Sequence, residues 1–414
     1  MTATPRVLVL TTYYHPVVGG VETHARQLVS YLHAHDVSVQ VVTKRVGRDQ
    51  PAEAHIDGVT VRRVGPSGER SAAGKWVAAP AFFWTLISLA AQYDVIVCVD
   101  YRGIGVAAVI AGALVGRPVI AQGETAGVLA GSGRHSSSGL PPESVLVRLL
   151  KAPARAIYRR ADQIVCIGRD LEREALGAGI PRARVHYLPH GVDLQRFRPA
   201  ASREEKDAVR RGIGWPVDRP IVLFVGRLSR EKGVMDLLEA WWQLDGGNAL
   251  LALVGPDMTG HPWDAGAPGR AFVEAHDLAG RVQFAGATDD PAPFYRAADV
   301  FVQPSHFEAL GNTAIEAMAS GLPVVTSGVG GLADFCVDGE NAMLYDVKSP
   351  PALAVAMRRV LADPAMRARL GEAGRRTAYE RFELGALLDR YLQLIETAGS
   401  EVTGGVRGER RGQR

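Results

Sequence analysis

The chain has 414 residues, of which 47% are apolar and 22% are charged, as is usual for a soluble globular protein. The formal net charge of +3 is too small to indicate a nucleic-acid-binding protein. The length exceeds what a single hydrophobic core normally serves, so we expect two domains of roughly 150–200 residues each.

The cysteines and the N-terminus indicate a cytoplasmic location. Cys98, Cys166 and Cys336 are far apart and form neither a CxxC pair nor a zinc-ligand spacing, as is typical of a protein in a reducing compartment. The chain begins with a strand pattern and shows no features of a signal peptide. Its longest apolar stretch, 76–91, has about 16 residues and contains Pro80, which is shorter than the roughly 20 residues that span a bilayer.

Alternating strand and helix patterns predict a parallel α/β domain in the first half of the chain. Residues 6–10 have a strand pattern in which all residues after Arg6 are apolar, residues 21–34 carry apolar side chains at helical spacing, and residues 37–43 have a second strand pattern. These three elements make a βαβ unit. Further strands are predicted at 59–64, 95–99, 119–121, 163–167 and 185–188.

The same pattern restarts after a polar stretch, 193–218, which we interpret as a linker. The second half is predicted to contain helices and the following strands: 221–225, 249–254, 282–284, 300–303 and 323–326. The predicted fold class is α/β, with Rossmann-like doubly wound domains at 1–192 and 219–383. Two such domains in one chain usually bind a ligand in the cleft between them, at the carboxyl ends of the strands.

The end of the chain is expected to form one helix and a tail. Residues 384–398 have helical spacing and are predicted to pack back on the N-terminal domain. Residues 399–414 are rich in Gly and Arg and lack apolar periodicity, which predicts a disordered basic tail.

A pair of carboxylates brackets a predicted anion site in the second domain. A buried strand ends at Pro304, a loop carries Glu308, and a helix begins near Asn312 with Glu316 close to its start. The free N–H groups of a helix start favour an anion such as phosphate. Carboxylates beside such a site are best interpreted as ligands of sugar or ribose hydroxyls. The alternative is a solvated Glu308 and a Glu316 that only favours the helix start.

Two cations follow the first strand of the second domain. Gly226 lies at the strand end, where backbone can come close to a ligand, and Arg227 and Lys232 follow five residues apart. Fixed cations stabilise the negative charge that grows on a departing phosphate group. The alternative is a solvated basic loop.

These segments resemble motifs of a known family. Seven residues separate Glu308 from Glu316, and residues 226–233 read Gly-Arg-Leu-Ser-Arg-Glu-Lys-Gly. They resemble the E-x7-E and G-R-L-x-x-x-K-G motifs of the retaining GT-B glycosyltransferases of glycosyltransferase family 4 (group 1), and the resemblance covers nearly the whole chain. It implies a GT-B architecture and retaining transfer of a hexosyl group from a nucleotide-sugar. No D-x-D motif follows a predicted strand, so we expect metal-independent transfer and no cofactor.

The resemblance also implies a role for each motif residue. Glu316 would bind the donor ribose and Glu308 the hydroxyls of the donor sugar, while Arg227 and Lys232 would stabilise the diphosphate. The donor-binding backbone would come from these residues: Gly19, Gly20, Gly226, Leu310, Gly311, Asn312 and Thr313. The turn at 328–331 and the segment 190–193, where His190 replaces the usual Asn, are interpreted as structural.

The acceptor side departs from the family pattern. Glu124 stands where many relatives carry a histidine, and Asp100 has a similar place just after a predicted strand. If both face the cleft, the acceptor pocket is acidic and suits a cationic acceptor such as an aminosugar or aminocyclitol. Glu124 could equally be an ordinary loop residue.

Several partners remain open at this level. The donor is expected to be UDP-glucose or UDP-N-acetylglucosamine, with a GDP-mannose-dependent mannosyltransferase or a non-catalytic nucleotide-sugar sensor as alternatives. The acceptor hydroxyl could belong to a glycan, a lipid-linked intermediate or a small natural product. Residues 147–160 have the pattern of a basic amphipathic helix and could contact the inner membrane face, although an ordinary surface helix explains the pattern as well.

Overall fold

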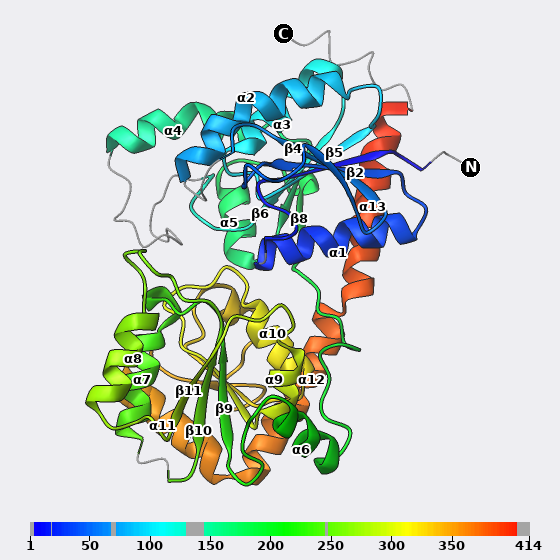
Figure 1. Cartoon of the computed structure of the whole chain (residues 1–414). Helices are drawn as coiled ribbons and strands as arrows, with labels where there is room; N and C mark the ends of the chain where they lie inside the picture. The colour runs from blue at the N-terminus through cyan, green and yellow to red at the C-terminus, as the bar shows by residue number, and fades with distance from the viewer. Residues whose placement is uncertain (1–3, 18, 68–71, 130–144, 245–246, 404–414) are drawn as a thin grey trace. The chain divides into compact units, whose positions relative to one another are not determined.

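The structure is a computed structural model that describes residues 4–17, 19–67, 72–129, 145–244 and 247–403 (Figure 1). It divides into two compact units. Unit 1 comprises Met1–Pro189 and Ala386–Arg414, and unit 2 comprises His190–Gly385. Each unit has its own parallel sheet covered by helices, which confirms the predicted pair of α/β domains.

The sheet of unit 1 has eight strands in the order β3-β4-β2-β1-β5-β6-β7-β8. Neighbouring strands are parallel except for the antiparallel pair β3 and β4. The strands are β1 Val7–Thr11, β2 Val39–Lys44, β3 Glu53–Ile56, β4 Val59–Val64, β5 Val95–Val99, β6 Val119–Gly123, β7 Gln163–Cys166 and β8 Val185–Tyr187. The central strands are buried on both faces, which is why their sequences are apolar throughout rather than alternating.

The helices of unit 1 are α1 Gly20–Ala34, α2 Ala72–Ser88, α3 Ile104–Val115, α4 Val145–Tyr158, α5 Arg169–Gly177 and α13 Leu384–Thr403, the last of which begins in unit 2. Helix α1 forms because Ala25, Leu28, Val29 and Leu32 repeat at helical spacing and are all buried. Among the described helices, none is long and apolar enough to cross a membrane.

Unit 2 contains a six-stranded parallel sheet in the order β11-β10-β9-β12-β13-β14. The strands are β9 Ile221–Val225, β10 Leu250–Val254, β11 Val282–Gly286, β12 Val300–Gln303, β13 Val324–Thr326 and β14 Met343–Leu344. The helices are α6 Arg203–Gly212, α7 Val234–Gln243, α8 Gly266–Ala275, α9 Ala292–Ala297, α10 Asn312–Ala319, α11 Pro350–Ala362 and α12 Pro364–Phe382. Since β9 and β12 are neighbours at the centre of the sheet, the loops after them meet at one sheet edge.

The stretch expected to be a linker, 193–218, is instead an integral part of unit 2. It contains α6, whose Arg210 is 1% exposed and donates to Asp299 Oδ2 at 2.6 Å. Lys206 Nζ donates to the other oxygen of Asp299, also at 2.6 Å. The segment is rich in charged residues partly because Lys206 and Arg210 bind Asp299 in the folded unit, and not because it is a solvent-exposed linker.

The end of the chain also differs from the expectation. Helix α13 continues to Thr403, so residues 399–403 are helical rather than part of a tail, and residues 404–414 lie outside the described part of the chain. From Ala386 onward the helix belongs to unit 1.

The chain enters and leaves unit 2 at adjacent positions. Val192 N–H donates to Phe382 O at 2.7 Å, and Leu384 N–H donates to Val192 O at 3.2 Å. A Cβ on Gly191 would lie 2.6 Å from the Leu384 Cα, so only glycine allows this approach. The structural interpretation of 190–193 is consistent with these contacts.

Candidate active site

The first part of the site in unit 2 is the loop that follows β9. Gly226 N–H donates to Val254 O at 2.9 Å. Gly255, after β10, has φ 147°, and a Cβ there would lie 1.9 Å from Gly226 O. The two loops therefore pack backbone against backbone, and this fixes the point where Arg227 leaves the sheet.

The two cations that follow differ in their surroundings. Arg227 Nη2 donates to Glu231 Oε1 at 2.7 Å, and its side chain is 51% exposed. Lys232 Nζ is 2.5 Å from Glu308 Oε1 in a pair that is largely buried. Arg227 thus remains accessible to an anion, while Lys232 joins the first motif to the second.

A glycine contact locks these two motif loops together. Gly233 has φ 70°, and a Cβ there would lie 2.0 Å from Pro304 O at the end of β12. His306 N–H donates to Glu231 O at 2.8 Å, and His306 Nε2 lies 2.8 Å from Asp236 Oδ2. The lysine and the glutamate are therefore positioned by the backbone as well as by their own ion pair.

Glu308 is a buried carboxylate with three donors. Lys232 Nζ, Gln303 Nε2 and Ser305 Oγ contact its Oε1 at 2.5, 2.6 and 2.7 Å. Burial alone would raise the pKa of the Glu308 carboxyl, but the charge of Lys232 and these hydrogen bonds outweigh burial and hold the pKa below its ordinary value. The group is therefore ionised at neutral pH, and Oε2 has the capacity to accept from a ligand hydroxyl.

The turn at 328–331 supports the loop that carries Glu308. Gly331 N–H donates to Glu308 O at 3.0 Å. Added Cβ atoms would lie 2.0 Å from Glu308 O at Gly330 and 2.2 Å from Ala309 O at Gly331. The glycines thus let one backbone segment lie directly on another, which sets the path of the chain into α10.

Helix α10 begins after Gly311, which has φ 99° and provides no side-chain cap. Uncapped N–H groups at a helix start are available to an anionic ligand, and they come from the segment 310–313 singled out in the sequence. His190 Nδ1 lies 3.2 Å from Asn312 Nδ2, so the buried His190 contacts the first residue of the helix.

Glu316 projects from α10 toward α9. Tyr295 Oη donates to Glu316 Oε2 at 2.8 Å. Burial raises the pKa of Glu316 to about 7, although the Tyr295 hydrogen bond and the charge of Arg196 act in the opposite direction. This carboxyl therefore titrates near neutral pH, in contrast to Glu308.

The residues predicted in unit 1 form a separate polar group. Gly19 is the N-cap of α1, with φ 179°, and Gly20 is its first residue; Val18 lies outside the described residues. Asp100 and Glu124 directly follow the neighbouring parallel strands β5 and β6, and both are buried. The structure thus brings the two carboxylates to one edge of the unit 1 sheet.

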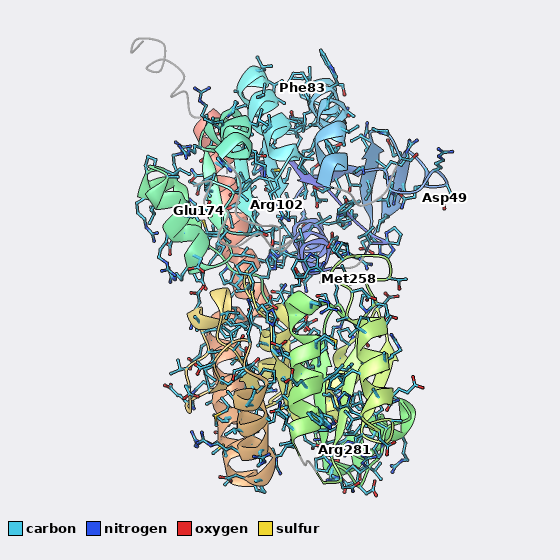
Figure 2. The ribbon with its side chains drawn as sticks, turned by 90° about the vertical axis from the view of Figure 1, so that its left-hand side faces the viewer. Asp49, Phe83, Arg102, Glu174, Met258 and Arg281 are labelled. Atoms are coloured by element: carbon cyan, nitrogen blue, oxygen red, sulfur yellow. The ribbon has the colours of Figure 1, made fainter. Side chains whose placement is uncertain are left out.

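Both carboxylates have protein partners. Arg102, labelled in Figure 2, donates to the two oxygens of Asp100 at 2.7 and 3.0 Å. Gln122 Nε2 donates to Glu124 Oε1 at 2.6 Å, and Gln122 Oε1 lies 3.3 Å from His24 Nε2. Arg102 therefore compensates the charge of Asp100, and its positive charge also acts on Glu124.

Family models match most of the chain. Residues 205–377 match the model of the glycosyl transferases group 1, and residues 18–196 match that of glycosyltransferase family 4. A D-inositol 3-phosphate glycosyltransferase of Thermomonospora curvata is 30% identical over 408 residues, which are 93% of this chain and 92% of the relative. The chain belongs to the group 1 glycosyltransferases. It is therefore a glycosyltransferase enzyme.

One further sequence relative and two solved structures are also similar to this glycosyltransferase. A lipopolysaccharide core biosynthesis glycosyltransferase of Rhizobium meliloti is 38% identical over 255 residues, covering 60% of this chain and 68% of the relative. The sucrose-phosphate synthase of Thermosynechococcus elongatus has a TM-score of 0.79 at 27% identity, with 96% of this chain and 100% of that chain covered. HepE of Anabaena, solved in complex with UDP and glucose, has a TM-score of 0.76 at 20% identity and 95% and 100% coverage. These neighbours confirm the GT-B fold.

Several residues that shape the site were missed from the sequence. Gln303 and Ser305 complete the hydrogen bonding of Glu308, and Tyr295 contacts Glu316. The sequence gives a weak indication of Gln303, because this polar residue ends an otherwise apolar strand. The sequence gives no indication of Tyr295, because its contact with Glu316 depends on how α9 packs on α10.

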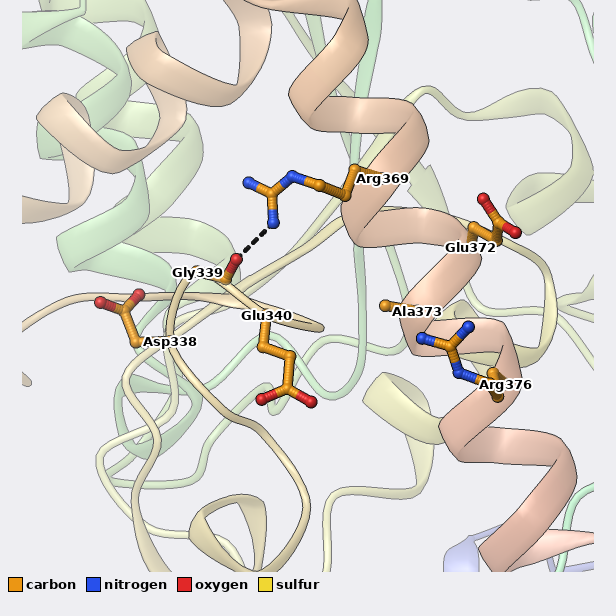
Figure 3. A pocket seen from close by; sticks show the side chains of 7 residues that line it. All are labelled: Asp338, Gly339, Glu340, Arg369, Glu372, Ala373 and Arg376. Carbon is orange, nitrogen blue, oxygen red and sulfur yellow. Dashed lines mark hydrogen bonds between the residues drawn. The ribbon is translucent and has the colours of Figure 1, made fainter.

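A pocket of about 530 Å³ also lies in unit 2 of the glycosyltransferase (Figure 3). It is formed by the loop around Gly339 and by α12, and Arg369 Nη1 donates to Gly339 O at 2.5 Å across it. Its lining is mixed in charge, with Glu340 and Glu372 beside Arg369 and Arg376. None of the residues lining it belongs to the predicted site.

Proposed function

We propose that this glycosyltransferase moves a hexosyl group from a nucleotide diphosphate sugar to an acceptor hydroxyl, with retention of configuration and without a metal ion. The observation that carries the proposal is the Lys232–Glu308 pair at 2.5 Å, placed beside the uncapped start of α10. A UDP-linked glucose or N-acetylglucosamine is the first choice of donor, supported by the UDP complex of the structural neighbour HepE.

The donor is held by groups of opposite character. The N–H groups of 310–313 and the side chains of Arg227 and Lys232 bind the diphosphate, while Glu316 accepts hydrogen bonds from the ribose. Glu308 accepts from hydroxyls of the sugar. Lys232 neutralises Glu308 within the site, so the carboxylate does not repel the phosphates beside it.

The chemical step breaks the bond between the anomeric carbon and the diphosphate oxygen and forms one to the acceptor oxygen on the same face of the sugar. The acceptor proton passes to an oxygen of the leaving diphosphate. Arg227 and Lys232 stabilise the negative charge that grows there; loss of one preorganised donor to a developing oxyanion costs about 2.7–4 kcal/mol in acyl-transfer enzymes. These two cations supply the stabilisation that a divalent ion gives elsewhere, which supports the metal-independent assignment.

The acceptor side of the proposal rests on unit 1. Glu124 accepts from an acceptor hydroxyl or pairs with an ammonium group, while Asp100 holds Arg102 rather than the acceptor. Acceptors with a cationic group, such as an aminosugar or an aminocyclitol, would pair with the Glu124 carboxylate, which also accepts from Gln122. Neutral glycans and lipid-linked intermediates are the competing acceptors.

A peripheral contact with the cytoplasmic face of a membrane is part of this proposal. Leu149 and Leu150 of α4 are 66% and 71% exposed, and no acidic residue occurs within the helix. Arg159 and Arg160 after the helix are exposed, whereas Arg155 is buried and donates to Val128 O at 3.1 Å. Exposed leucines flanked by cations favour binding to anionic lipid.

The donor proposal is tested by thermal stabilisation of the protein with UDP, GDP and ADP, followed by hydrolysis of the matching nucleotide-sugars. Stabilisation by UDP with hydrolysis of UDP-glucose or UDP-N-acetylglucosamine is expected. Stabilisation by GDP would indicate the mannosyltransferase, and nucleotide binding without turnover on any acceptor would indicate a sensor. Glu316→Ala should remain folded and lose nucleotide binding, and an unchanged affinity would remove the ribose assignment.

A further inference from the structure

A buried tyrosine lies behind the nucleotide-binding carboxylate. Tyr295 of α9 is 0% exposed, and its hydroxyl is 2.8 Å from Glu316 Oε2 and 3.3 Å from Thr313 O. A phenol has one proton to donate. The shorter contact to the carboxylate is the stronger bond, so the proton points to Glu316.

Aromatic packing fixes the position of this hydroxyl. The Tyr295 ring lies edge-on to Phe197, with centroids 5.6 Å apart and planes at 77°. On another side it is tilted at 41° against Phe301 of β12, also at 5.6 Å. Because the ring is held between the segment before α6 and the central sheet, the hydroxyl is a fixed point for the Glu316 side chain.

We propose that Tyr295 is the positioning residue of the nucleotide site, which holds Oε2 of Glu316 so that Oε1 faces the donor ribose. The inference rests on the proposed ribose role of Glu316. Tyr295 contacts the carboxylate rather than the ligand, so it acts through Glu316.

The same hydrogen bond favours the ionised carboxylate, the form that accepts from two ribose hydroxyls. Burial raises the pKa of Glu316 to about 7, and the bond from Tyr295 opposes this rise. The other charge facing the group is Arg196, which is itself bound to Asp290 at 2.9 Å. Loss of the phenol proton donor therefore moves the titration of Glu316 to higher pH, and nucleotide affinity at neutral pH falls.

The test uses the full chain with Tyr295→Phe, which keeps the ring and its packing and removes only the hydroxyl. UDP, GDP and ADP are titrated between pH 6 and pH 9, and the nucleotide that binds the wild-type protein is the probe. We expect a roughly tenfold weaker Kd at pH 7. The difference in Kd between the variant and the wild type should become smaller toward pH 9, where Glu316 is ionised in both proteins. Tyr379→Phe, at a side chain that is 67% exposed, is the matched control and should bind as the wild type does.

A second variant separates this inference from the assignment of the site. Glu316→Gln removes the charge that Tyr295 orients, so adding Tyr295→Phe to it should cause no further loss of affinity. Wild-type affinity in Glu316→Gln, or no nucleotide binding by the wild-type chain, would remove the ribose role and the inference together. If Glu316→Gln binds weakly but Tyr295→Phe binds normally, or loses affinity by the same factor at every pH, only the role of Tyr295 is wrong.

Discussion

The two units hold their polar groups in opposite ways. In unit 2, Lys232 and Glu308 are 76 residues apart in sequence and join two distant loops. In unit 1, Asp100 pairs with Arg102 and Glu124 accepts from Gln122, each two residues away. In unit 2, Arg227 is 51% exposed and accessible to an anion, whereas in unit 1 both Asp100 and Glu124 are buried. An accessible arginine suits a diphosphate, and a buried carboxylate suits the hydroxyl or ammonium group proposed for the acceptor.

The largest effect is expected from breaking the pair in unit 2. Lys232→Ala removes the proposed phosphate ligand and leaves the buried Glu308 carboxylate without its cation, so kcat for donor hydrolysis should fall about 10²–10³-fold. Arg230→Ala, at an exposed position in the same turn, is the control and should change kcat less than about twofold. Comparable losses in both variants would show that the turn, and not Lys232, matters.

The backbone contact beneath that pair should be the next most sensitive feature. Gly233→Ala places a Cβ 2.0 Å from Pro304 O at φ 70°. We expect the free energy of unfolding in urea to fall by about 2–3 kcal/mol. Gly212→Ala is the control, because a Cβ at that residue, the last of α6, meets no atom within 4 Å. Equal stability of the two variants would show that the close approach of Gly233 to Pro304 O does not constrain the fold.

A smaller effect is expected on the acceptor side. Glu124→Gln keeps a side chain that can hydrogen-bond to Gln122 but removes the negative charge of Glu124. The other carboxylate, Asp100, keeps its direct bond to Arg102. The KM for an aminosugar or aminocyclitol acceptor should rise about tenfold, and the Kd of the nucleotide should not change. An acceptor screen in which only neutral or anionic compounds react would overturn the cationic acceptor, and an unchanged KM would remove Glu124 from the site.

The smallest effect on catalysis is expected from α4. Leu149→Glu with Leu150→Glu should abolish co-sedimentation with vesicles of anionic phospholipid, because two exposed apolar side chains become charges of the wrong sign. Hydrolysis of the donor in solution should remain within about twofold of the wild-type rate, as is usual for surface substitutions. Leu176→Glu, on α5, should sediment as the wild type does. Wild-type sedimentation of the double variant would favour the ordinary surface helix.

The fold was largely accessible from the sequence. The predicted strands 59–64, 95–99, 221–225 and 300–303 coincide with β4, β5, β9 and β12, because buried parallel strands are apolar runs bounded by turn residues. Helix α12 was missed although its signals were present, with Asp363 as the N-cap accepting from Met366 N–H and Pro364 as the first residue.

The site was accessible only where a motif joined distant residues. Two glutamates at a fixed spacing and two cations after a strand predict Arg227, Lys232, Glu308 and Glu316 as site residues, and the structure brings Lys232 and Glu308 into contact. The Tyr295 contact could not be predicted because it depends on how α9 packs on α10. The glycine contacts at 233 and 330 depend on which backbone passes within 2–3 Å in the folded unit. The interpretation of 193–218 as a linker was wrong because it took charged residues to be solvent-exposed. Arg210 is charged, but it is buried and paired with Asp299 in the folded unit.

The adjacent ends of unit 2 have an evolutionary and practical consequence. His190–Gly385 is one continuous segment of the chain, and near its two ends Val192 is hydrogen-bonded to Phe382 and Leu384. Replacing such a segment with its counterpart from a related enzyme changes no other connection in the chain. If unit 2 binds the donor as proposed, exchanging it by two crossovers, at the codons for residues near 190 and 385, should change the donor preference and keep the acceptor preference.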